Sequence, residues 1–253
     1  MRNNQGEEIQ HMFSAIAPNY DCANHCLSFG IDYYWRACLV KKVKACQPKV
    51  VVDLATGSGD VALALKNELG SETDVRGYDF CDDMLAVAKE KDSASTVSFN
   101  FGDCTHLPIE DNSVDVITIA FGLRNVIDRK KGLAEMQRVL NKEHGKLFVL
   151  EFSRPNIWFK PFYYFYLRMV LPVLAFFTTG NCSAYKYLGD SISIFPSAKN
   201  LKKEIEEAGF KDVSYRKLTQ GVVAIHEALP VNVNHTQSLK YSTNQSIANC
   251  RNI

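Results

Sequence analysis

The sequence VVVDLATGSGDVALAL at residues 50–65 constrains the fold more than any other part of the chain. An apolar, strand-like run leads directly into a glycine turn, and a helical stretch follows the turn. Gly57 and Gly59 have no side chains, so the backbone there can approach a ligand closely. This order predicts an α/β fold with a ligand bound at the turn.

The same order of strand and helix repeats along the chain. Short apolar runs end at Gly, Asp or Pro, and stretches with apolar residues at helical spacing follow them. This alternation predicts a doubly wound parallel sheet with helices on both faces. The expected strands are residues 50–54, 75–78, 97–101, 114–120 and 146–151, and the expected helices between them are residues 60–69, 83–91 and 129–140.

Three regions of the chain differ in character. Residues 1–48 begin with a polar, uninformative stretch and continue as a helical segment that is expected to contribute to a lid over the ligand site. Residues 49–229 are expected to form the main domain. Residues 230–253 are rich in Asn, Ser, Thr and Gln, and they have too few large apolar groups to offset their ordering entropy. We therefore expect a disordered tail.

The end of the main domain predicts a helix and a hairpin. Residues 198–208 have the pattern of an amphipathic helix that ends at Gly209. Two β-rich segments, 213–219 and 222–227, follow it and are expected to close the sheet as an antiparallel hairpin.

An aromatic insertion at about 155–197 interrupts the main domain. Its stretch 157–180 is apolar without a regular period, but Lys160 and Arg168 interrupt the apolar run and two prolines would break a helix. A transmembrane span is therefore not expected. The stretch is either a buried helical cap or a lid whose apolar face meets an apolar substrate or a membrane surface, and one segment can serve as both.

Composition excludes several classes of partner. Lys and Arg number 29 against 28 Asp and Glu, so the formal net charge is +1 and no overall basic surface is available for nucleic acid. The 8 cysteines lie at irregular spacing without paired Cys/His motifs, so no metal site is expected. They are expected to be reduced thiols, and the start MRNNQGEE has no secretory leader, so we expect a cytoplasmic protein.

The charge of the glycine turn distinguishes two classes of cofactor. Gly57, Gly59 and Ala62 satisfy the dinucleotide pattern GxGxxG/A. However, Asp53 precedes the glycines and Asp60 follows them, and carboxylates there would repel a pyrophosphate. S-adenosylmethionine carries an ammonium and a sulfonium but no phosphate, so acidic neighbours suit it. The turn predicts this cofactor, and a nicotinamide dinucleotide remains the alternative.

Two further acidic residues follow the next two strands. Asp79 ends the second strand, where a carboxylate can hold the ribose hydroxyls. Asp103 follows the third strand and is placed to accept the adenine amine, with Phe80 and Cys104 as flat neighbours. Asp103 is alternatively a turn former. Its register with Asp79 and the glycine turn favours the cofactor role.

Five sequence blocks carry a resemblance to a known family. They are YDCANHCLSFGIDYYW at 20–35, DLATGSGD at 53–60, FGLRNVID at 121–128, RVLNKEHGKLFVLEFS at 138–153 and LTQGVVAIHEA at 218–228. Over roughly residues 13–229 the chain resembles the ubiquinone/menaquinone biosynthesis C-methyltransferases, the UbiE/COQ5 family. The family usually has Met and His where this chain has Ala23 and Asp32, which leaves any catalytic role at position 32 open.

The resemblance implies a fold and a set of cofactor contacts. The fold is that of class I S-adenosylmethionine-dependent methyltransferases, a Rossmann-like sheet with a C-terminal antiparallel hairpin. The cofactor contacts of the family fall on Ser58, Asp79, Asp103, Cys104 and Ala120 of this chain.

The resemblance also implies the reaction, which is methylation of a ring carbon of a polyprenylated quinol, with demethylmenaquinol as the favoured acceptor. A ring carbon becomes nucleophilic once a ring hydroxyl loses its proton, and a free phenol of this type has a pKa near ~10. Arg124 follows the fourth strand and could stabilise the phenolate or order a water that accepts the proton. Asn125 could bind the second ring oxygen, and Tyr20 could close over the ring. The alternative for Arg124 and Asn125 is a surface loop with a helix cap at Asn125.

Other functions stay open at the level of sequence. One is methylation of a different small apolar phenolic acceptor, and another is a non-catalytic scaffold subunit in a quinone-synthesis complex. A prenylated acceptor would give the aromatic stretch at 158–177 a use as an apolar groove and as a peripheral contact with the inner face of a membrane. The sequence leaves the oligomeric state open, with a homodimer as one alternative.

Overall fold

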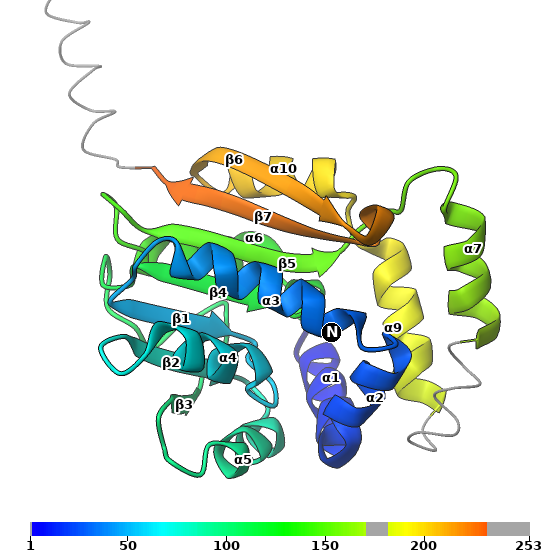
Figure 1. Ribbon diagram of the computed structural model, residues 1–253, viewed down its shortest axis with the longest axis horizontal. Coiled ribbons are helices and arrows are strands. Elements are labelled where there is room, and N and C mark those ends of the chain that lie inside the picture. Colours follow the sequence, from blue (N-terminus) through cyan, green and yellow to red (C-terminus); the bar gives the residue numbers. More distant parts are fainter. Residues whose placement is uncertain (1, 171–181, 232–253) are drawn as a thin grey trace, which may run out of the picture.

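The computed structural model describes residues 2–170 and 182–231 (Figure 1). Residues 1, 171–181 and 232–253 lie outside the described part, and so do the predicted tail and a portion of the aromatic stretch. Within the described part, no helix is both long and apolar enough to cross a bilayer. Nor do three His, Cys, Asp or Glu side chains gather there into a group that could hold a metal ion.

A seven-stranded sheet with the order β3-β2-β1-β4-β5-β7-β6 forms the centre of the molecule. The strands β1 to β5 are parallel, whereas β7 is antiparallel to both β5 and β6. The predicted doubly wound sheet with a C-terminal antiparallel hairpin is therefore confirmed. The strands are β1 (Val50–Leu54), β2 (Asp74–Asp79), β3 (Ser98–Phe101), β4 (Val116–Ala120), β5 (Lys146–Phe152), β6 (Phe210–Leu218) and β7 (Val223–Pro230).

Helices cover both faces of this sheet and its carboxyl edge (Figure 1). The helices are α1 (Arg2–Ile16), α2 (Tyr20–Leu27), α3 (Ile31–Lys44), α4 (Asp60–Leu69), α5 (Asp82–Lys91), α6 (Arg129–Val139), α7 (Lys160–Phe165), α9 (Cys182–Ile194) and α10 (Ala198–Glu207). A π-helical turn (Tyr166–Val170) extends α7, and a short 3-10 helix, η2 (Leu123–Asn125), follows β4.

Helix α1 begins earlier than the polar start of the sequence suggests. The sequence assigns no element to its first ten residues, but α1 begins at Arg2. Its apolar side chains occur only in the second half, where Ile9 and Ile16 are buried. Gln10 also donates a hydrogen bond from Nε2 to the backbone oxygen of Phe80 at 2.9 Å. These tertiary contacts stabilise a helix whose first turns carry no periodic signal of their own.

The two faces of the sheet bury alternate residues of the central strands. Val51 and Val116 pack in one cluster with side chains of α3 and α4. Val52 and Ile117 point to the other face and pack with side chains of α6 and α10. Because β1, β4 and β5 are buried on both faces, they show nearly continuous apolar runs in the sequence, as central parallel strands usually do.

The topology also determines where a ligand can bind. Strand β1 lies between β2 and β4, so the chain crosses over in opposite directions on its two sides. Ligands of open α/β sheets bind outside the carboxyl ends of the strands at such a point. Helices α1, α2 and α9 gather at this edge, on the right-hand side of Figure 1.

A buried histidine gives the fold a predicted pH dependence. His226 of β7 is 2% exposed and donates a hydrogen bond from Nε2 to the backbone oxygen of Ala198 at 2.9 Å. Burial lowers the pKa of His226, and this hydrogen bond offsets only part of the effect. The unfolded chain therefore takes up this proton first, and stability is lost as the pH falls below about 6.5. Below this pH, we expect the free energy of unfolding of His226→Gln, measured in urea melts, to fall less steeply with pH than that of the wild type. The two slopes should differ by at most about 1.4 kcal/mol per pH unit.

The matched control for this prediction is the exposed His106. His106→Gln should leave the pH dependence of the wild type unchanged. Equal slopes for His226→Gln and the wild type would show that burial does not control this proton.

Candidate active site

A cavity of about 740 Å³ lies at the carboxyl ends of the central strands. Its walls come from the glycine turn, from the segments that follow β2, β4 and β5, and from the helices packed over that edge. Among the residues that the sequence predicts for the site, the cavity is lined by Tyr20, Asp53, Gly57, Ser58, Asp79, Phe80, Asp103, Cys104, Ala120, Arg124 and Asn125.

Gly59 is not among the described residues that line this cavity. It has φ +82° and lies against the sheet, where a Cβ atom would be 2.8 Å from Cζ of Phe99. Its amide donates a hydrogen bond to the oxygen of Thr56 at 3.0 Å. Gly59 thus lets the turn close tightly before α4 begins.

Two buried carboxylates accept hydrogen bonds from residues of the glycine turn. Asp79 is 6% exposed and accepts a hydrogen bond from the amide of Gly57 at 2.8 Å. Asp53 accepts hydrogen bonds from the hydroxyls of Thr56 and Thr118, both at 2.6 Å. Burial raises the pKa of Asp53 to about 6, although these hydroxyls oppose the shift. Burial likewise raises the pKa of Asp79.

Asp60 has cationic partners that the sequence did not reveal. The sequence treats Asp60 as an unpaired carboxylate, but it forms ion pairs with Lys91 and with Nη2 of Arg36, the latter at 3.4 Å. The amides of Gly57 and Gly59 donate to Asp79 and to Thr56, so these two donors of the turn already have partners within the protein.

Helix α2 is tied to the glycine turn by polar contacts. Asp21 accepts hydrogen bonds from the hydroxyl of Ser58 and from Nζ of Lys91, the latter at 2.7 Å. Lys91 of α5 therefore bridges Asp21 on α2 and Asp60 on α4. The hydroxyl of Ser58, which the resemblance assigns to the cofactor, is occupied by Asp21 in this arrangement.

Asp32 lies in the wall of the cavity and is buried. It accepts hydrogen bonds from Ser28, Arg36 and His25, the last at 2.7 Å from Nδ1. Burial alone would raise the pKa of Asp32, but these three partners outweigh it and lower the pKa. The carboxylate of Asp32 is thus ionised and holds Arg36 in place. Arg36 also lines the cavity, and the sequence patterns did not single it out.

Asp103 and Cys104 follow β3 at the edge of the cavity. Asp103 is exposed and accepts hydrogen bonds from the amide and hydroxyl of Thr105 at 2.7 and 2.9 Å, so it does form a turn. Burial raises the pKa of Cys104 to about 12, so this thiol stays protonated and presents an uncharged surface to the cavity.

Arg124 enters the cavity from the segment after β4 and is held by a buried carboxylate. The Arg124 and Glu151 side chains are 6% and 0% exposed, and Arg124 Nη1 lies 2.9 Å from Glu151 Oε1. Glu151 also accepts the amides of Arg124 and Phe152, at 3.3 and 2.8 Å. The guanidinium lies 5.3 Å from the centroid of the Phe152 ring. Nε of Arg124 has no hydrogen-bond partner among the described residues.

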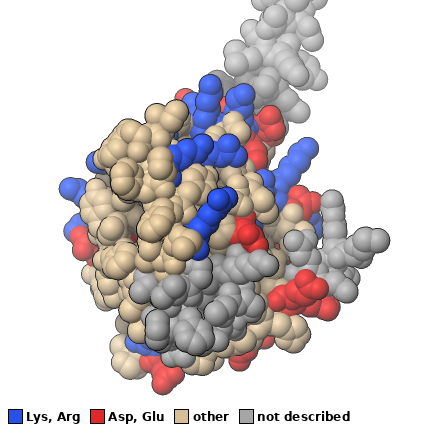
Figure 2. All heavy atoms as spheres, turned by 90° about the vertical axis from the view of Figure 1, so that its right-hand side faces the viewer, with Lys and Arg blue, Asp and Glu red and all other residues tan. Residues whose placement is uncertain are grey.

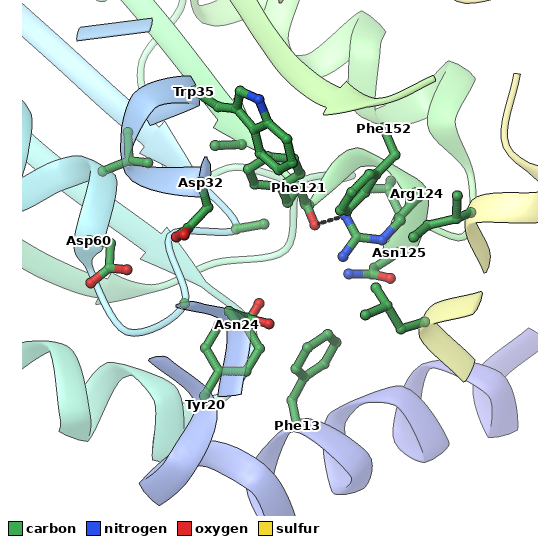
Figure 3. A pocket seen from close by; sticks show the side chains of 18 of the residues that line it. Phe13, Tyr20, Asn24, Asp32, Trp35, Asp60, Phe121, Arg124, Asn125 and Phe152 are labelled. Atoms are coloured by element: carbon green, nitrogen blue, oxygen red, sulfur yellow. Dashed lines mark hydrogen bonds between the residues drawn. The ribbon is translucent and has the colours of Figure 1, made fainter. Parts of the chain in front are cut away.

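Asn125 and Tyr20 face the same space (Figure 3). Oδ1 of Asn125 accepts a hydrogen bond from the hydroxyl of Tyr187 at 3.1 Å, which leaves its amide group available as a donor. Burial raises the pKa of Tyr20, and the charge of Arg124 offsets part of that shift. Tyr20 therefore stays protonated near neutral pH.

An aromatic wall adjoins Arg124. The ring centroids of Phe121 and Phe152 are 4.9 Å apart, and Trp35 lies 5.9 and 6.2 Å from them. Figure 3 shows these rings on one side of the cavity, with Phe13 and Tyr20 on the opposite side. Such a space suits a flat aromatic ligand.

The comparisons with known proteins agree with this geometry. Residues 1–230 match the model of the ubiE/COQ5 methyltransferase family. The chain belongs to this family. A relative from Geotalea daltonii, named ubiquinone/menaquinone biosynthesis C-methyltransferase UbiE, is 44% identical over 88% of this chain and 96% of its own length. The demethylmenaquinone methyltransferase of Thermus thermophilus is 45% identical over 85% of this chain and 98% of its own length.

Solved structures place this ubiE/COQ5 methyltransferase in the class I fold. A SAM-dependent methyltransferase from Thermotoga maritima has a TM-score of 0.61 at 19% identity and covers 87% of this chain and 98% of its own. One from Aquifex aeolicus has a TM-score of 0.55, also at 19% identity, over 75% of this chain and 88% of its own. At this identity the likeness concerns the fold.

The packing of Gly59 predicts a large loss of stability on substitution. Gly59→Ala imposes an unfavourable positive φ and also overlaps Phe99, so we expect it to lower the free energy of unfolding by roughly 2–5 kcal/mol. Gly30 is also in the left-handed region, with φ +72° and ψ 3° against +82° and 6° for Gly59, but the nearest atom to its Cβ position is Cδ2 of Tyr33 at 3.9 Å, so Gly30→Ala should cost only about 1–2 kcal/mol. Denaturant melts of both variants measure the difference. Equal losses would mean that the contact with Phe99 does not constrain the turn.

Proposed function

We propose that this protein methylates a ring carbon of a polyprenylated quinol, with demethylmenaquinol as the favoured acceptor and S-adenosylmethionine as the methyl donor. The observation that carries the proposal is a buried guanidinium, that of Arg124, inside an aromatic cavity at the carboxyl ends of the strands. The names of the relatives from Geotalea daltonii and Thermus thermophilus support the substrate class.

The residues of the cavity fit the proposed methyl donor. Asp79 uses one lone pair of each carboxylate oxygen for the amides of Gly57 and Cys81, so further lone pairs remain for the ribose hydroxyls. Phe80 and Cys104 offer uncharged surfaces for the adenine. The acidic side chains of Asp53, Asp60 and Asp79 in the walls suit a ligand with an ammonium and a sulfonium. When bound, S-adenosylmethionine supplies an electrophilic methyl group.

The chain's own residues prepare the acceptor. A quinol hydroxyl has a pKa near ~10, and the ring carbon is nucleophilic only after this proton has passed to water. The carbon would then take the methyl group as the bond between methyl and sulfur breaks, and its own hydrogen would be lost to water as a proton, which restores the aromatic ring. The Arg124 guanidinium stabilises the phenolate, because a fixed positive charge in a water-poor cavity acts at low effective dielectric. The aromatic wall holds the ring flat and excludes water, and the amide of Asn125 donates to a ring oxygen.

This mechanism predicts that only the reduced ring is a substrate. We expect a singly prenylated demethylnaphthoquinol to gain one methyl group from labelled S-adenosylmethionine, as measured by mass spectrometry, whereas the oxidised quinone gains none. A methoxy-benzoquinol in the same assay distinguishes the two branches of quinone synthesis. Methylation of the oxidised ring would contradict the role of the phenolate.

The same assay tests the role of Arg124 against that of a second arginine with similar contacts. Arg129 also pairs with a glutamate, Glu204 at 3.0 Å, and lies 5.5 Å from the centroid of Phe195, but it does not line the described cavity. We expect Arg124→Lys to lower kcat about 10²–10³-fold and Arg129→Lys to leave it near the wild-type value. Unchanged kcat in Arg124→Lys would sink the proposed mechanism.

Calorimetry and the methylation assay together decide among the other functions that the sequence left open. A scaffold subunit would bind S-adenosylmethionine weakly or not at all, and a nicotinamide oxidoreductase would bind NAD at the same turn. A methyltransferase for a different phenolic acceptor would bind the methyl donor but leave both prenylated quinols unmethylated.

We also propose that the protein is cytoplasmic and that it docks through α7 on the inner face of a membrane. Trp158, Phe162 and Phe165, on α7 and just before it, are 59%, 67% and 63% exposed. Lys160 and Arg168 lie in the same segment. In the view of Figure 2, residues other than Lys, Arg, Asp and Glu cover much of the described surface, and several Lys and Arg side chains lie between them. Aromatic and basic side chains together suit an anionic lipid surface.

We expect the protein to co-sediment with vesicles that contain phosphatidylglycerol and to bind less to vesicles of phosphatidylcholine alone. Trp158→Ser combined with Phe165→Ser should weaken the binding, and so should Lys160→Glu combined with Arg168→Glu. The control is Phe101→Ser, because Phe101 is an exposed aromatic residue of the edge strand β3. Unchanged sedimentation of both double variants would count against docking through α7.

A further inference from the structure

Tyr163 of α7 has a buried hydroxyl for which the described residues offer no hydrogen-bond partner. The residue is 7% exposed, and it lines the same cavity as Arg124. Three buried side-chain atoms without a partner occur in the described part of the chain, namely Nε of Arg124, the hydroxyl of Tyr163 and Nδ1 of His226. The first two belong to residues of one cavity.

Other tyrosines in this region have satisfied hydroxyls. The hydroxyl of Tyr166 donates to the backbone oxygen of Leu27, and that of Tyr187 donates to Asn125. Tyr20 forms a hydrogen bond with Asn24. A buried hydroxyl without a partner costs folding free energy, so proteins rarely retain one without a use. Tyr163 is thus the exception in its surroundings.

The missing partner must be an acceptor. Burial raises the pKa of Tyr163, and the charge of Arg124 offsets only part of this shift, so the hydroxyl keeps its proton. Tyr163 and Arg124 line the same cavity, and the charges of Arg124 and Glu151 both act on the pKa of Tyr163. A ligand oxygen beside Arg124 would satisfy the guanidinium and the hydroxyl together.

We propose that Tyr163 is a positioning residue that donates a hydrogen bond to a ring oxygen of the acceptor, next to the guanidinium of Arg124. The inference rests on the proposed function, since it assigns this residue to the quinol rather than to the methyl donor. It implies that the cavity selects rings with oxygen substituents, because a ring without them leaves two buried donors unpaired.

The test is Tyr163→Phe, assayed with the singly prenylated demethylnaphthoquinol. We expect the KM for this quinol to rise about threefold to tenfold, as the loss of one hydrogen bond would do, with a smaller change in kcat. The affinity for S-adenosylmethionine, measured by calorimetry, should stay unchanged. The Tm of the ligand-free variant should rise, because the substitution removes an unpaired buried group.

Tyr164 provides the matched control. It is the next residue of α7, it is half-buried, and it is not among the described residues that line the cavity. Tyr164→Phe should change neither KM nor Tm. A structural role for Tyr163 predicts the opposite signature, a lower Tm with an unchanged KM, and this result would overturn the proposal.

The outcomes also separate this inference from the proposed function. If the wild-type protein methylates the quinol but Tyr163→Phe has the same KM, the assignment of Tyr163 is wrong and the function stands. If the wild-type protein methylates no quinol, the proposed function fails and the inference fails with it. A loss of S-adenosylmethionine affinity in Tyr163→Phe, with the KM for the quinol unchanged, would place this hydroxyl on the methyl donor instead.

Discussion

The buried pair of Arg124 and Glu151 is the interaction on which the proposed chemistry depends. A guanidinium withdrawn from water is strongly disfavoured unless a carboxylate and further hydrogen bonds compensate it. Glu151, in the buried strand β5, supplies the carboxylate, and the backbone oxygen of Phe121 accepts a further hydrogen bond from Nη1 of Arg124. The amides of Arg124 and Phe152 in turn donate to Glu151. The pair joins the segment after β4 to the end of β5, so the parallel order of these two strands is what brings the charge to the cavity.

The hydrogen bonds of the glycine turn bear on the choice of cofactor together with its charge. Two of its amides donate to Asp79 and to Thr56, so these donors are not free to bind a phosphate. Lys91 and Arg36 neutralise much of the acidity of Asp60. Hydrogen-bond occupancy therefore adds to the repulsion between like charges that the sequence suggested.

The sequence predicted the sheet, the order of strands and helices along the chain and eleven residues that line the cavity, because central parallel strands have continuous apolar runs and their carboxyl ends meet at one edge. It could not reveal the partners of Asp60, since Lys91 lies on another helix and only the folded chain brings them together. The role of Glu151 could not be predicted, because this residue lies near the end of an apolar strand. The burial of Tyr163 could not be predicted either, because it lies in an aromatic run without a regular period.

Phe162 is both exposed and part of the cavity lining, so the cavity reaches the surface beside α7. If the chain attached to a bound ring left the cavity there, its further units would lie outside the protein. Such a geometry would make turnover indifferent to how many isoprene units the tail carries. One enzyme could then serve a cell whose quinone pool is heterogeneous in length.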